Sequence, residues 1–281
     1  QMKTNFQQIK LVLSNDFFLT PKKIVPLITI IFLAIFWFFT LRGFNASYGD
    51  FDGLAKGIEN ESQTRGFFLW LFDVDEERLR AAPSAFLFLF TIFSLWTTHY
   101  FIILITSDQT ASEVGNRYFR YLVTRCGRTE LFLGRLLSAL LLTIFIIVLI
   151  CLAALLTFSL IDRQISWGSA FFVLQTGCWV FLHCIPFVCL CSMVSAWSGS
   201  VGISMLCSMI LAFLLPKFFT LIELQWSEVE GIESMRFFFP GSVSNSILSG
   251  NGNSLTVIVP LLYAIAFASI GCSIFRRREF P

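Results

Sequence analysis

Residues 131–160 read LFLGRLLSALLLTIFIIVLICLAALLTFSL, and Arg135 is the single charged side chain among them. A helix needs about 20 consecutive apolar residues to cross a hydrocarbon core of roughly 30 Å, so this run is longer than one crossing requires. We expect the helix to tilt, or its first turns to lie at the membrane interface, where Arg135 can extend to the lipid headgroups. The stretch predicts a transmembrane helix.

The rest of the chain has the same character. Of its 281 residues, 56% are hydrophobic and 14% are charged, whereas soluble domains carry roughly 25% charged residues. This excludes a soluble globule, and disorder would need low hydrophobicity. The predicted fold is an all-α polytopic membrane protein, a single transmembrane domain over residues 1–281 with six spans. Besides 131–160, the expected spans are 24–41, 84–106, 168–194, 200–220 and 254–275.

The distribution of charge predicts the orientation of the six spans. An even number of crossings places both termini on one side, and that side carries 12 Lys or Arg against 5 Asp or Glu, a net charge of +7. The other side carries 8 basic and 13 acidic residues, a net charge of −5. Basic residues accumulate on the cytoplasmic side of membrane proteins, so we expect both termini to be cytoplasmic. The segments counted as cytoplasmic are 1–23, 107–130 with Arg135, 195–199 and 276–281.

Three segments outside the spans have predicted roles. Within the cytoplasmic segment 1–23, apolar residues recur at helical spacing up to Pro21, which predicts an amphipathic elbow helix on the inner membrane surface. An ordinary N-terminal extension is the alternative. The external loops, 42–83 and 221–253, contain apolar clusters at 66–72 and 237–239 that could dip into the outer leaflet, with ordinary loop packing as the alternative.

Motifs of enzymes and of nucleotide binding are absent from the sequence. It contains no GxxxxGK[ST], HExxH or GxSxG. His99 and His183 are the two histidines, on different predicted spans, and we expect His183 to bond a neighbouring backbone or Ser group rather than a metal. The eight cysteines fit buried thiols, with a metal site as the weaker alternative. We therefore expect no catalytic, cofactor or metal site in this chain, no nucleic-acid partner and no energy source of its own.

The one sizeable cytoplasmic loop is residues 107–130, SDQTASEVGNRYFRYLVTRCGRTE. If this loop is helical, Glu113, Arg117 and Arg120 share a charged face, because they are spaced at i, i+4 and i+7. Tyr118 lies on another face. A short helix with a charged face and an aromatic side chain is typical of a docking element. The alternative is a basic loop that merely follows the positive-inside rule.

The same loop resembles that of the ABC exporter permeases of the second class, which have the type V fold. Their loop reads Glu-x-x-x-Gly-Thr-Leu-x-x-Leu-Leu-x-x-Pro-x-x-Arg-x-Glu-Leu-x-x-Gly-Lys. Matching positions here are Glu113, Leu122–Val123–Thr124, Arg128, Glu130–Leu131 and Gly134–Arg135. Departures are Arg117–Tyr118 in place of Gly-Thr and Arg125 in place of Pro. The six-span permeases paired with a separate ATPase, such as that of nitrous-oxide-reductase maturation, are most similar in layout.

The resemblance implies a function. Within the coupling loop 107–130, residues 107–128 would form a coupling helix seated in a separate ABC ATPase subunit, which binds ATP and Mg. Two permease chains, expected to be identical, would pair as a dimer in the bacterial inner membrane. The elbow helix would brace the first span. The implied coupling residues are Glu113, Arg117, Tyr118, Phe119, Arg120 and Arg128. The expected activity is export of a substrate. The alternative is ATP-driven mechanical signalling to an extracytoplasmic partner without transport; an intramembrane enzyme is disfavoured.

Overall fold

The computed structural model describes residues 2–19, 24–46, 85–107, 111, 127–162, 166–225 and 254–278. Over these ranges the secondary structure is helical and contains no strand, which confirms the all-α prediction. The helices are α1 (Met2–Leu19), α2 (Ile24–Ala46), α6 (Ala85–Thr106), α9 (Arg128–Asp162), α10 (Trp167–Ser198), α11 (Val201–Gln225) and α14 (Ser254–Arg277). Most of the predicted external loops, at 47–84 and 226–253, lies outside the described residues.

Four helices are long and apolar enough to cross a membrane: α6, α9, α10 and α14. The other two predicted spans coincide with α2 and α11, whose described apolar stretches are shorter, Leu27–Thr40 and Val201–Leu214. The longest helix is α9, and its 35 residues correspond to about 52 Å at 1.5 Å per residue. This exceeds a hydrocarbon core of roughly 30 Å, so one part of α9 must extend beyond the core or the helix must tilt.

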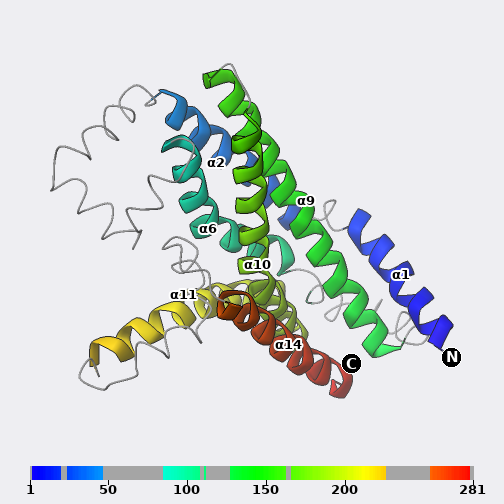
Figure 1. Cartoon of the computed structure of the whole chain (residues 1–281). Helices are drawn as coiled ribbons and strands as arrows, with labels where there is room; N and C mark the ends of the chain where they lie inside the picture. Colours follow the sequence, from blue (N-terminus) through cyan, green and yellow to red (C-terminus); the bar gives the residue numbers. More distant parts are fainter. Residues whose placement is uncertain are drawn as a thin grey trace.

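The central helix is α10, which packs against α6, α9, α11 and α14. It begins at the N-cap Ser166, whose Oγ accepts a hydrogen bond from the backbone N–H of Ser169 at 3.0 Å. It ends at Gly199, whose φ of 66° is a left-handed conformation that glycine adopts without strain. Pro186 lies inside the helix and removes one backbone hydrogen bond. Figure 1 shows α10 changing direction part-way along its length, as an internal proline favours.

The helices form two groups around α10 (Figure 1). Buried side chains of α2, α6, α9 and the first half of α10 form one core, which includes Trp37, Phe90 and Phe158. The second half of α10 packs with α11 and α14, which run at a different slant from α9 in Figure 1. Both described ends of the chain lie at the same end of the molecule, beside the start of α9.

Two glycines allow α10 to approach its neighbours closely. A Cβ atom on Gly177 would lie 2.9 Å from Sγ of Cys151 on α9. A Cβ atom on Gly271 of α14 would lie 3.0 Å from the Cα of Met193 on α10. Small residues at such crossings let helix backbones pack tightly, as is common between membrane helices.

The N-terminal helix α1 packs along the first turns of α9. The resemblance implied that this helix braces the first span, which corresponds to α2, and the packing of α1 on α9 leaves that expectation untested. The approach is close at Gly134 of α9, where an added Cβ would lie 2.8 Å from Cβ of Val12 and 3.2 Å from the carbonyl oxygen of Ile9. The missing side chain at residue 134 leaves room for α1, so α9 provides the groove in which α1 lies.

Candidate functional site: helix ends joined by arginines

Five of the six predicted coupling residues lie outside the described part of the chain: Glu113, Arg117, Tyr118, Phe119 and Arg120. The sixth, Arg128, is the first residue of α9 and therefore marks the exit of the loop into a long apolar helix. The structure thus shows how the predicted coupling loop is attached, at the point where its chain enters α9.

Arg128 holds the C-terminal end of α14. Its Nη1 donates hydrogen bonds to the carbonyl oxygens of Arg276 at 2.8 Å and Arg278 at 2.9 Å. The last carbonyls of a helix have no partner within the helix, and a cation there also complements the negative end of the helix dipole, an effect of about 0.3–1 kcal/mol. Arg128 therefore caps a helix that is 148 residues away along the chain.

Arg278 makes the equivalent contact with α10. Its Nη1 donates to the carbonyl oxygens of Ala196 and Trp197, the latter at 2.8 Å. The start of α9 is thereby joined to the end of α14, and the end of α14 to the end of α10. The chain of two arginines, Arg128 and Arg278, is called the arginine relay below. A displacement at the loop exit would reach two other helices through it.

A third arginine joins α9 to α1. Arg135 Nε lies 3.3 Å from Oδ2 of Asp16, and the Arg135 side chain is only 3% exposed. The sequence predicted that Arg135 would extend to the lipid headgroups, and that prediction is wrong. The physical reason is that α1 covers this side of α9 and brings Asp16 as the counter-charge, so the guanidinium is paired within the protein.

The two histidines, which lie on different predicted spans, face each other between α6 and α10. The rings of His99 and His183 are 5.1 Å apart between centroids, and Phe187 stacks on His99 at 4.9 Å. His99 Nδ1 donates to the carbonyl oxygen of Leu95 at 3.1 Å. His183 Nδ1 is buried and has no hydrogen-bond partner among the described residues, so the predicted bond to a neighbouring backbone or Ser group is not found at this atom.

A row of polar side chains, called the polar seam below, lies between the same two helices and leads to the histidines. Thr91 of α6 and Thr176 of α10 share a hydrogen bond of 3.1 Å between their hydroxyls. One turn further along α6, the buried hydroxyls of Ser94 and Thr98 lack partners in the described region and line a cavity of about 10 Å³, room for about one water molecule. The spacing of residues 91, 94 and 98 was a signal of this seam, since i, i+3 and i+7 share a helix face.

The described residues contain no group of three or more His, Cys, Asp or Glu that could hold a metal ion. What the described residues do contain is a set of joined helix ends at one end of the molecule and a small row of polar side chains in its interior. Comparison with models of known protein families finds no match for this sequence, and a comparison with curated proteins finds no match either.

Proposed function

We propose that this chain is the membrane-spanning permease subunit of an ABC exporter, which works with a separate ATPase subunit and a second permease chain. The chain would lie in the bacterial inner membrane with both termini cytoplasmic. It would bind no cofactor itself, because ATP and Mg belong to the ATPase.

The observation that carries the proposal is the arginine relay. Arg128 lies near the end of the segment whose sequence resembles that of the permease coupling loop, and it holds the end of α14, which in turn holds the end of α10. A coupling element must pass a movement from an ATPase to membrane helices. The relay supplies that path, since a shift at the exit of the loop would act on three apolar helices together.

The chemistry of the loop supports a protein partner. Glu113, Arg117 and Arg120 would give orienting charged contacts, and Tyr118 or Phe119 would be the buried anchor, since aromatic and Arg side chains contribute strongly at protein interfaces. Arg128 has a different task in this proposal: it transmits the movement rather than binding the ATPase.

The experiment is purification of the tagged chain from its native membrane, followed by identification of what is retained. The proposal expects a soluble-type subunit that carries GxxxxGK[ST], in equal amount with the permease chain, and its loss in Tyr118→Ala. If the intact wild-type chain is obtained with no ATPase, in membranes where the subunit is expressed, the proposal is wrong. Retention of the ATPase with no transported substrate, together with an extracytoplasmic protein, would favour mechanical signalling.

A further inference from the structure

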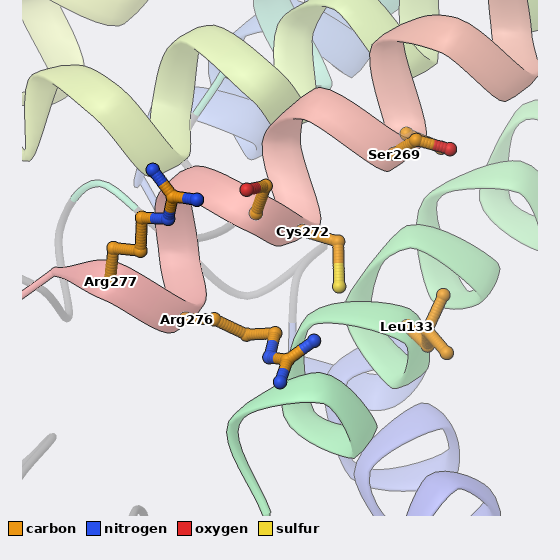
Figure 2. Close-up of a pocket in the computed structure, with 7 residues that line it drawn as sticks. Leu133, Ser269, Cys272, Arg276 and Arg277 are labelled. Carbon is orange, nitrogen blue, oxygen red and sulfur yellow. The ribbon is translucent and has the colours of Figure 1, made fainter.

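A pocket of about 580 Å³ lies between the first turns of α9 and the last turns of α14. Leu133 lines it from α9, and Ser269, Cys272, Arg276 and Arg277 are among the residues that line it from α14. Figure 2 shows Cys272 and Arg276 pointing from α14 toward α9, while Arg277 leaves the helix in another direction. The arginine relay is next to this pocket, because Arg128 bonds the backbone of Arg276.

The pocket changes from apolar to basic along α14. Its lining begins at Ala268 and ends at Arg277, a distance of about 14 Å at 1.5 Å per residue. Ala268 and Cys272 precede the arginines on α14, Leu133 lines the pocket from the first turns of α9, and both arginines lie at the end of α14. Ser269 alternates with the apolar residues, and Ser273 lies between Cys272 and the arginines in sequence. The cations thus lie at the end of the helix, as they would at the aqueous side of a membrane leaflet.

Neither guanidinium is needed to cap the helix on which it lies. Arg128 already bonds the terminal carbonyls of α14. Arg276 and Arg277 are exposed, and no hydrogen bond or ion pair of their guanidinium groups is found with the residues that the structure describes. The face of α14 above them also exposes apolar side chains such as Leu262 and Ile265. An occupant must therefore be anionic at one end and apolar at the other.

We propose that this pocket binds one anionic glycerophospholipid. Its phosphate would lie at Arg276, with Arg277 adding positive charge at the rim of the pocket, its glycerol region beside Ser273, and part of one acyl chain along Cys272 and Leu133. Basic pockets at the cytoplasmic ends of membrane helices attract anionic headgroups, and a free phosphate would leave the apolar part of this pocket unoccupied. The bound lipid would connect α9 to α14 beside the arginine relay. The inference rests on the membrane location of these helices and does not depend on the ABC permease proposal.

The test is native mass spectrometry of the full chain, after reconstitution in an equal mixture of phosphatidylglycerol and phosphatidylcholine. The wild type should retain one phosphatidylglycerol per chain, at least roughly tenfold more often than phosphatidylcholine. The double variant Arg276→Gln/Arg277→Gln should lose this preference. The matched control, Lys3→Gln/Lys10→Gln, removes the same charge from another cytoplasmic segment and should keep it. Gel filtration and circular dichroism check that each variant folds.

A second variant distinguishes the contribution of the apolar space in the pocket from that of the two arginines. Ser269→Trp leaves both arginines in place but fills part of the apolar space, so it should reduce retention of phosphatidylglycerol several-fold. It also carries the test if the double arginine variant fails to fold. Equal retention of the two lipids by the wild type, equal loss in the lysine control, or retention of inorganic phosphate in place of the lipid would each overturn the proposal.

Discussion

Gly134 of α9 is a residue at which α1 approaches closely. A methyl group there would lie 2.8 Å from Cβ of Val12 and 3.2 Å from the carbonyl oxygen of Ile9. Val12 is stiff because it is β-branched, and the carbonyl belongs to the backbone, so α1 would have to move. We expect Gly134→Ala to destabilise the protein by roughly 1–3 kcal/mol and to lower the Tm measured by tryptophan fluorescence in detergent.

Gly202 on α11 is the matched control, since an added Cβ there meets nothing within 4 Å. Alanine favours a helix by about 1 kcal/mol relative to glycine, so Gly202→Ala should leave the Tm unchanged or raise it. If the Tm decreases equally in both variants, the close approach of α1 at Gly134 does not contribute to the free energy of unfolding.

The Arg135–Asp16 ion pair also joins α1 to α9. Asp16→Asn would leave the charge of Arg135 in a nearly buried place without its carboxylate, which should cost up to about 3 kcal/mol. Arg135→Met/Asp16→Leu replaces both partners by apolar groups and should be closer to the wild type. A double-mutant cycle on unfolding free energies, built from Asp16→Leu, Arg135→Met and this double variant, measures the coupling, which we expect to reach about 1 kcal/mol or more. If the changes in unfolding free energy of the two single variants simply add up in the double variant, the ion pair does not contribute to stability.

At the scale of the helices, the arginine relay predicts a local effect of Arg128→Gln. Glutamine is shorter than arginine and carries no charge, so it cannot replace the hydrogen bonds of Arg128 to both carbonyl oxygens of α14. The last turn of this helix should therefore open more often. Hydrogen exchange of backbone amides over residues 272–278 should become about two- to fivefold faster, as the loss of about 0.3–1 kcal/mol implies. The measurement is mass spectrometry of peptides from that segment.

Lys10→Gln serves as the control for charge, because Lys10 is an exposed side chain on α1. It should leave exchange at residues 272–278 unchanged. If the exchange rate in Arg128→Gln rises equally in all segments, the variant is destabilised as a whole and has not lost a helix cap alone. If the exchange rate at residues 272–278 is unchanged, the arginine relay does not link α9 to α14.

At the scale of the whole molecule, the helices could be predicted from the sequence to within a few residues, because apolar runs such as 131–160 are long and nearly uncharged. The contacts between them could not. Uniform hydrophobicity does not say which face of a helix meets its neighbour, so the pairing of His99 with His183 and of Arg135 with Asp16 depended on the fold. Arg128 was singled out as a coupling residue from its motif, yet nothing in the motif indicated that it caps α14.

The central claim is that residues 107–130 couple this chain to an ATPase, and ATP hydrolysis by the reconstituted complex tests it most directly. The wild-type chain should stimulate hydrolysis by its ATPase subunit, and Arg120→Glu should return the rate to that of the subunit alone. Arg125→Glu makes the same charge change in the same loop, away from the face that Glu113, Arg117 and Arg120 would share in the predicted helix, and should retain most of the stimulation. Full stimulation in a correctly inserted Arg120→Glu variant would contradict the account.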